Sequence, residues 1–209
     1  MRASNNTNDH VQPFIVGIGG TTREGSSSEA ALHACLAAAS RRGARTSAIV
    51  GSELAFPAYS PHVTMRTAEA SRMVELVRDC DGLIIASPGY HGVVSGLIKN
   101  ALDYLEDLRL DERPYLSERA VGCIVCAAGW QAVGTTMMTL RAIAHALRAW
   151  PTPVAAGLNT ADPTFDASCL SPDHDPHPQI DLVADQVVHF ARMQVSRRVV
   201  ERGHDRWLV

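Results

Sequence analysis

The stretch that decides the fold reads FIVGIGG and occupies residues 14–20. An apolar run this short, without a polar position, is typical of a strand that is buried on both faces of a parallel sheet. Small polar residues follow as far as Ser26, and a helical pattern that includes Leu32 and Leu36 then continues to about Arg42. The stretch therefore predicts a strand, a turn and a helix in direct succession.

The same succession of apolar runs and helical patterns recurs along the chain. Four further apolar runs predict strands at Thr46–Val50, Gly82–Ala86, Ala120–Cys126 and Thr152–Ala156. Four further helical patterns predict helices at Ala68–Cys80, Ser95–Leu108, Thr135–Ala149 and Gln179–Val200. Because right-handed crossovers place the helices on both faces of such a sheet, the predicted fold class is α/β, a doubly wound five-stranded parallel sheet in a three-layer sandwich.

Length and composition are those of one globular domain. The chain has 209 residues, of which 46% are apolar and 20% are charged, so it has enough apolar material for a core. We assign residues 13–200 to the domain, and residues 1–12 and 201–209 to flexible tails. Residues 157–178 are rich in Pro, Asp and His, which predicts a surface loop before the last helix.

Charge and cysteine content argue against several classes of protein. The formal net charge of -3 predicts no nucleic-acid partner, and no apolar run approaches the roughly 20 residues of a membrane span. The polar N-terminus lacks the apolar centre of a secretory signal. Five cysteines, an odd number, suit reduced thiols in the cytoplasm better than a disulfide framework.

Ligands of doubly wound sheets bind beyond the carboxyl ends of the strands, near the point where the strand order reverses. The first loop at that edge reads GGTTREGSSS, residues 19–28. Glycines and a helix N-terminus present N–H groups to an anion, hydroxyls and an arginine add donors, and the loop predicts a site for one phosphate monoester. It lacks the lysine of a Walker loop and the third glycine of a dinucleotide loop. The alternative is a flexible turn with an ordinary Ser N-cap.

The second loop follows the predicted strand that ends at Ala86, and residues 87–104 read SPGYHGVVSGLIKNALDY. Pro88 and Gly89 predict that the chain leaves the strand there. Tyr90 and His91 are then expected at the ligand edge, where a flat aromatic ring could pack against the loop.

These two loops resemble the NADPH-dependent FMN reductase family, which has a flavodoxin-like fold. Members carry GSxRxxS after the first strand, which residues 20–26 match with Thr21 in place of Ser. Members carry PxYxxxxxGxxKNAxDW after the third strand, which residues 88–104 match with Tyr104 in place of Trp. A third family feature, a glycine-containing loop after the fourth strand, is matched by residues 128–131, and the resemblance covers about residues 13–157.

The resemblance implies a role for each matched position. The FMN phosphate would be held by Thr21, Arg23, Ser26 and Ser28. The isoalloxazine ring would be lined by Pro88, Gly89, Tyr90, His91 and Gly92, and its other edge would be closed by Gly129, Trp130 and Gln131. For Trp130 an interface plug is an equal alternative. The KNAxD helix would support the loop and a subunit interface. Many members have Glu-Tyr-Asn where this chain has Gly89-Tyr90-His91.

The function implied by the resemblance is that of an FMN-dependent oxidoreductase. NADPH or NADH would pass hydride to the flavin, and a small-molecule acceptor would take the electrons: free flavin that feeds a partner monooxygenase, a quinone, an azo compound or a metal ion. No catalytic side chain is required, although His91 could relay a proton. Family members are usually homodimers or homotetramers.

Two alternative functions remain open from the sequence. In the first, bound FMN oxidises a small organic metabolite directly, for example an aminodeoxychorismate-type ring in secondary metabolism. In the second, the protein is an electron-shuttle flavodoxin with a protein partner, although such proteins are usually more acidic than a net charge of -3.

Two further patterns have a plainer explanation than the chemistry they suggest. Cys123 and Cys126 match CxxC but lie within a predicted strand, which favours core cysteines over a redox pair. Residues 173–178 contain Asp and His, but no further ligand group follows at a recognised spacing, so we expect a solvated loop and no metal site.

Overall fold

A parallel sheet runs through the middle of the protein in the order β2-β1-β3-β5, and two short strands, β6 and β7, both pair with β5. The computed structural model describes residues 12–205. The strands of the sheet are β1 Phe14–Gly19, β2 Arg45–Val50, β3 Gly82–Tyr90, β5 Ala120–Ala127, β6 Trp150–Pro151 and β7 Ala156–Asn159. A further strand, β4 Val93–Val94, pairs antiparallel with the end of β3. The predicted doubly wound parallel sheet is confirmed.

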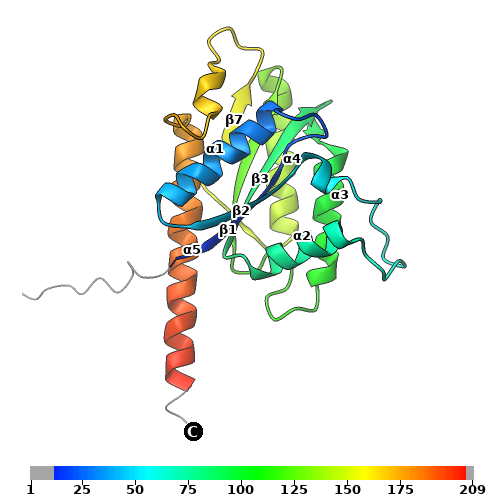
Figure 1. Cartoon of the computed structure of the whole chain (residues 1–209), viewed down its shortest axis with the longest axis vertical. Coiled ribbons are helices and arrows are strands. Elements are labelled where there is room, and N and C mark those ends of the chain that lie inside the picture. Colours follow the sequence, from blue (N-terminus) through cyan, green and yellow to red (C-terminus); the bar gives the residue numbers. More distant parts are fainter. Residues whose placement is uncertain (1–11, 206–209) are drawn as a thin grey trace, which may run out of the picture.

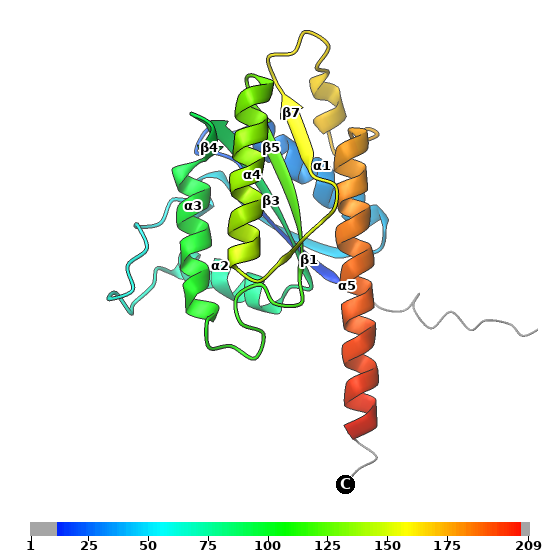
Figure 2. The ribbon, with the colours of Figure 1, turned by 180° about the vertical axis from the view of Figure 1, so that it is seen from behind.

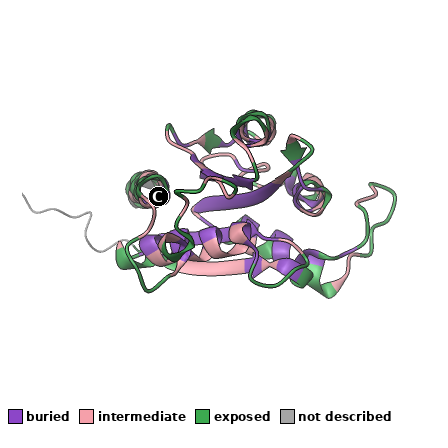
Figure 3. Ribbon diagram, turned by 90° about the horizontal axis from the view of Figure 1, so that it is seen from above, coloured by how far each residue is buried: buried purple, intermediate pink, exposed green. Residues whose placement is uncertain are grey.

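Helices cover both faces of the sheet and complete the three layers (Figures 1 and 3). One face is covered by α1 Ser27–Arg41 and α5 Pro178–Asp205. The other face is covered by α2 Ala68–Asp79, α3 Gly96–Asp103 and α4 Trp130–Ala146. Short 3-10 helices lie at η2 Gly51–Leu54, η3 Tyr104–Leu108 and η4 Ala167–Leu170. Each face has its own apolar core, because β1, β3 and β5 send alternate side chains to opposite sides.

The third strand does not stop at Ala86 as predicted. β3 continues to Tyr90, and Ser87 and Pro88 pair with β5. Proline is tolerated here because the pairing of β3 with β1 ends at Ala86, which leaves that side of β3 an open edge. The turn comes later, at His91 and Gly92, and it leads into β4.

The predicted fifth strand at Thr152–Ala156 is also wrong in its bounds. The chain pairs with β5 before and after this segment, in β6 and β7. The N–H of Thr152 still donates to the carbonyl of Val121 on β5 at 3.0 Å, and the pairing is then interrupted until Ala156. Pro153 has no N–H to donate. The N–H of Val154 donates to Oε1 of Gln186 on α5 at 3.0 Å. Its hydrogen-bond partner is therefore a side chain of a helix and not the backbone of a neighbouring strand.

The last two helices have different bounds from those predicted. α4 begins at Trp130, directly after Gly129, and not at the predicted Thr135. Gly134 therefore lies inside the helix and does not interrupt it. α5 runs to Asp205 and so continues beyond its predicted end at about Val200. Its end extends past the sheet (Figures 1 and 2). The predicted tail residues 1–11 and 206–209 lie outside the described residues.

Two glycines in the sheet set how closely α5 packs on it. A Cβ at Gly122 would lie 2.5 Å from Cγ1 of Val183, and one at Gly82 would lie 2.8 Å from Cγ1 of Val187. Valine is stiff about its first side-chain torsion, so neither contact can be relieved by a simple rotation. The helix and both strands would have to move apart.

We expect Gly122→Ala to lower the free energy of unfolding by about 1–3 kcal/mol, the usual cost of overpacking a core. Gly134→Ala is the matched control, since a Cβ at Gly134 would meet nothing within 4 Å. It should raise the free energy by up to about 1 kcal/mol, because alanine favours a helix over glycine. Urea unfolding of the three proteins measures both effects, and equal stability of Gly122→Ala and the parent would contradict this packing.

Candidate functional site

The carboxyl ends of β1, β3 and β5 meet at one edge of the sheet, uppermost in Figure 1. β3 lies between the other two strands, with Ala86 opposite Gly19 and Pro88 opposite Cys126. The loops that follow these three strands are therefore neighbours, although they are far apart in the sequence. We call them the first loop (residues 20–26), the hairpin (residues 88–94) and the third loop (residues 128–131).

The first loop is built from two glycines and a local hydroxyl turn. Gly20 and Gly25 have φ values of +89° and +66°, which favour glycine. Oγ1 of Thr21 accepts the N–H of Arg23 at 3.1 Å and is 3.2 Å from its carbonyl. The guanidinium of Arg23 is exposed and has no hydrogen bond or ion pair with any residue of the described chain. It is free to meet an anion.

Ser26 and Ser28 lie where the first loop enters α1. Oγ of Ser26 accepts the N–H of Glu29 at 3.3 Å, so Ser26 is the N-cap of the helix. The hydroxyls of Ser26 and Ser28 are 3.4 Å apart, and both residues are buried. The structure shows the Ser N-cap, which is compatible with either interpretation of the first loop, and the N-terminus of α1 is directed at that loop.

Glu29 was not predicted for this site. Its carboxylate lies beside Gly20, where an added Cβ would be 3.5 Å from Oε2 of Glu29. A negative charge in the first turn stabilises the helix, but it also reduces the attraction of the first loop for an anion. The Ser-x-x-Glu spacing of a capping box, from Ser26 to Glu29, is the sequence signal that could have located it.

The hairpin carries the residues predicted to line a ring. His91 and Gly92 form its two-residue turn, with φ values of +52° and +82° typical of a type I′ turn. Tyr90 is 53% exposed, and His91 is also exposed. A Cβ at Gly89 would lie 2.9 Å from Oγ1 of Thr136 on α4, so packing against α4 accounts for glycine at this position.

The hairpin is anchored to the start of α3. Oγ of Ser87 accepts the N–H of Ser95 at 3.1 Å and donates to the carbonyl of Pro88 at 2.9 Å. Ser95 in turn caps α3 by accepting the N–H of Ile98 at 3.3 Å. Both serines are buried, so these contacts fix where the hairpin leaves the sheet.

The third loop is held by a residue that the sequence did not reveal. Oδ1 of Asn159, at the end of β7, accepts the N–H of Gly129 at 2.8 Å and that of Ala161 at 3.1 Å. Trp130 and Gln131 are exposed and form the first turn of α4 instead of belonging to a loop. A single asparagine at a strand end carries no sequence signal of such a role.

The KNAxD helix, α3, whose start anchors the hairpin, also supports a second loop. Oδ1 of Asn100 accepts the N–H of Tyr59 at 2.8 Å, and its Nδ2 donates to the carbonyl of Pro57 at 3.0 Å. Both partners lie in the loop between β2 and α2, not in the hairpin. Lys99 and Asp103 form an exposed ion pair one turn apart.

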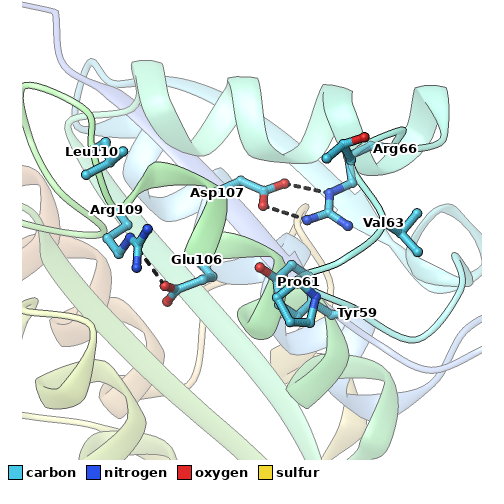
Figure 4. Close-up of a pocket in the computed structure, with 9 residues that line it drawn as sticks. Tyr59, Pro61, Val63, Arg66, Glu106, Asp107, Arg109 and Leu110 are labelled. Atoms are coloured by element: carbon cyan, nitrogen blue, oxygen red, sulfur yellow. Dashed lines mark hydrogen bonds and ion pairs between the residues drawn. The ribbon is translucent and has the colours of Figure 1, made fainter.

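A groove of about 410 Å³ lies beside this support, between the β2–α2 loop and η3 (Figure 4). Arg66 and Asp107 cross it as a bidentate pair at 2.7 and 2.8 Å, and Arg109 pairs with Glu106 at 3.7 Å. Its charges are therefore already paired, and it shares no residue with the first loop, the hairpin or the third loop.

Cys123 and Cys126 are buried free thiols on opposite faces of β5, as core cysteines should be. Burial raises the pKa of each thiol to about 12, so neither is a thiolate at neutral pH. Within residues 12–205 no cluster of three or more His, Cys, Asp or Glu side chains is placed to bind a metal. None of the helices described there has the length and apolar character needed to span a bilayer.

Comparison with known proteins identifies the chain at the level of a family. The model of the NADPH-dependent FMN reductase family matches residues 13–162. An FMN-dependent NADPH-azoreductase of Staphylococcus aureus (strain USA300) is 28% identical over 141 residues, which cover 66% of this chain and 71% of the relative. An NADPH azoreductase of Bacillus sp. (strain OY1-2) is 36% identical over 59 residues, 28% of this chain and 33% of that relative's length.

A solved structure agrees on the fold. The flavoenzyme NAD(P)H:(acceptor) oxidoreductase FerB from Paracoccus denitrificans superimposes with a TM-score of 0.67 at 14% identity, covering 87% of this chain and 98% of FerB. The flavodoxin-like fold expected from the sequence is confirmed.

We expect Asn159→Ala to loosen the third loop, because the N–H groups of Gly129 and Ala161 both lose their acceptor. The loss should lower the free energy of unfolding by about 1–3 kcal/mol and speed hydrogen exchange at the Gly129 amide. Asn159→Asp keeps an acceptor oxygen and is the control. Unchanged exchange at Gly129 in the alanine variant would show that Asn159 does not hold this loop.

Proposed function

Because this chain belongs to the NADPH-dependent FMN reductase family, we propose that it binds FMN at the carboxyl edge of the sheet and delivers electrons from NADPH or NADH to a small-molecule acceptor. When bound, FMN supplies the two-electron chemistry, since a flavin accepts hydride from a reduced nicotinamide. The observation that carries the assignment is the unpaired Arg23 beside the N-terminus of α1.

The residues at this edge fit the cofactor. The guanidinium of Arg23, the N–H groups of the first loop and the N-terminus of α1 would hold the phosphate, and the hydroxyls of Thr21, Ser26 and Ser28 are further donors at this loop. A Cβ at Gly25 would have open space around it, so the first loop leaves room for a ligand. The carboxylate of Glu29 opposes the phosphate, and we infer that it limits the affinity.

The ring of the cofactor is assigned to the space between the hairpin and the third loop. Tyr90 of the hairpin and Trp130 at the start of α4 are both exposed and offer flat apolar surfaces, and a Cβ at Gly129 would have nothing within 4 Å. Backbone N–H groups of Gly89 to Gly92 and of Gln131 are the donors available for the polar edge of the ring. These residues bind and orient the ring, and no side chain is assigned as an acid or base.

The acceptor is proposed from the relatives and from chemistry. The relatives are named azoreductases, which supports an azo compound, while a quinone or free flavin for a partner monooxygenase would use the same open flavin face. The alternatives of a metabolite dehydrogenase and an electron-shuttle flavodoxin are not favoured by the family match. The five cysteines are all free, which supports a cytoplasmic location.

A homodimer or homotetramer is proposed from the exposed apolar side chains near the site. The hairpin and α4 expose Tyr90, Val93, Trp130 and Met138, with exposed fractions of 53%, 49%, 61% and 74%. Exposed apolar groups gathered on neighbouring elements favour contact with a second copy. Trp130 then contacts either the flavin or the partner subunit.

Anaerobic titration of the FMN-loaded protein tests the proposed function. We expect NADPH or NADH to bleach the yellow flavin band and an azo compound or quinone to restore it. A protein that binds no FMN would contradict the cofactor assignment. A yellow protein that is bleached only by an organic metabolite, or only by a redox protein, would establish one of the two alternatives instead.

Arg23→Ala should weaken FMN binding by about 1.5–3 kcal/mol, roughly ten- to a hundredfold in dissociation constant, because a charge-assisted contact to the phosphate is lost. Arg78→Ala is the control, since Arg78 pairs with Asp111 and lies at the end of α2 that leads into the amino end of β3, away from the first loop. Fluorescence titration with FMN and with riboflavin, which lacks the phosphate, measures the effect. An equal loss for both ligands would show that Arg23 does not contact the phosphate.

A further inference from the structure

A hollow of about 360 Å³ lies at the carboxyl end of β7, between the start of α4 and residues 162–178. Figure 1 shows that this segment, in yellow and orange, rises at the same edge of the sheet as the three loops. Trp130 lines the hollow and is also the first residue of α4, directly after Gly129, so the hollow adjoins the place assigned to the ring of FMN. The other residues that line the hollow have no direct contact with FMN in the proposed function.

The hollow carries negative charge. Asp162, Asp166 and Asp175 line it, and its lining includes no lysine or arginine. The N–H and hydroxyl of Thr164 hold the pKa of Asp162 below its usual value, with a smaller contribution from Trp130. The N–H and hydroxyl of Ser168 do the same for the pKa of Asp166. Both carboxylates are therefore ionised at neutral pH.

The one histidine in the lining does not offset this charge. Nδ1 of His177 accepts the N–H of Gln179 at 3.2 Å, so any proton on the neutral ring is on Nε2. Burial lowers the pKa of His177 below its usual value. At neutral pH the imidazole is therefore uncharged, and the hollow keeps the charge of its carboxylates.

The walls of the hollow include two aromatic rings, those of Trp130 and Phe165. Trp130 is 61% exposed, so its ring is available to a ligand, and Asn159 fixes the backbone next to it by accepting the N–H of Gly129. An aromatic face attracts a cation through its negative potential, and tryptophan does so most strongly. An aromatic wall beside ionised carboxylates is the chemistry that recognises an organic cation and disfavours a phosphate.

Both aspartates also have a local structural role, and it does not use up their charge. Oδ1 of Asp162 accepts the N–H of Thr164 at 2.9 Å, and Oδ1 of Asp166 accepts the N–H of Ser168 at 2.8 Å. Asparagine makes the same turns, so the turns alone do not require a charged residue. Both positions nevertheless carry a carboxylate where a neutral amide would make the same turn. Binding of a cation in the hollow would explain this choice.

We propose that this hollow is the acceptor subsite, and that it binds a cationic aromatic compound, such as one with a quaternary ammonium group on its ring. The inference rests on the proposed function only in calling the ligand an acceptor, because the binding chemistry belongs to the hollow itself. The negative charge of the hollow would also keep NADPH apart from the acceptor, because it repels the phosphate groups of NADPH. The nicotinamide of NADPH would then approach the flavin from another side.

Binding of a charged probe and its uncharged isostere tests the proposal. The probes are para-hydroxyphenyl trimethylammonium and para-tert-butylphenol, which have nearly the same shape and differ in charge. We expect the FMN-loaded protein to bind the cation about five- to tenfold more tightly in calorimetry or ligand-observed NMR. In the double variant Asp162→Asn, Asp166→Asn the preference should fall by at least half, because only Asp175 and the aromatic rings then favour the cation, while both turns are kept.

Asp173→Asn is the matched control, because Asp173 is exposed in the same segment but does not line the hollow. It should keep the preference for the cation. Equal binding of the two probes by the parent protein, or a preference that is undiminished in the double variant, would overturn the proposal. The same samples are titrated with NADPH. If NADPH bleaches the flavin but the protein shows no preference for the cationic probe, the proposed subsite alone is contradicted. A protein without FMN contradicts the proposed function, and the probes then test the hollow in the flavin-free chain.

Discussion

The pairing of β3 with β1 on one side and β5 on the other is the constraint on which the site depends. Parallel strands end at the same edge, and the register places Ala86 beside Gly19 and Pro88 beside Cys126. Three loops separated by dozens of residues in the chain therefore become neighbours. Glycines at positions 82 and 122 keep this sheet tightly packed under α5, since a Cβ at either would meet a valine of that helix.

Two of the three loops, the hairpin and the third loop, are held by contacts from segments outside them. Ser87 ties the hairpin to the start of α3, and Asn159 ties the third loop to the end of β7. Thr136 of α4 packs against Gly89, which leaves no room for a side chain there. These contacts give the proposed cofactor a prearranged edge, so less conformational freedom is lost when a ligand binds.

Charge divides this edge of the molecule into two regions with opposite preferences. Arg23 and the N-terminus of α1 favour an anion at the first loop, even with Glu29 close by. Asp162 and Asp166 favour a cation in the hollow beyond Trp130. For a flavoenzyme that takes a phosphorylated cofactor and a small acceptor, such a division would keep the two ligands apart without a moving part. The proposed subsite thus explains charge that the binding of FMN alone does not need.

The sequence by itself determined the elements and their order, because apolar runs and helical spacing are local signals that burial imposes on each segment. It also located the first loop, whose glycines and Arg23 stand together in the chain. Where β3 ends depends on its neighbours in the sheet, since Pro88 is tolerated because the pairing of β3 with β1 stops at Ala86. Asn159 and the hollow likewise depend on segments that meet only in the folded chain. No local pattern reports which distant backbone N–H an asparagine will accept, or which carboxylates will face the same space.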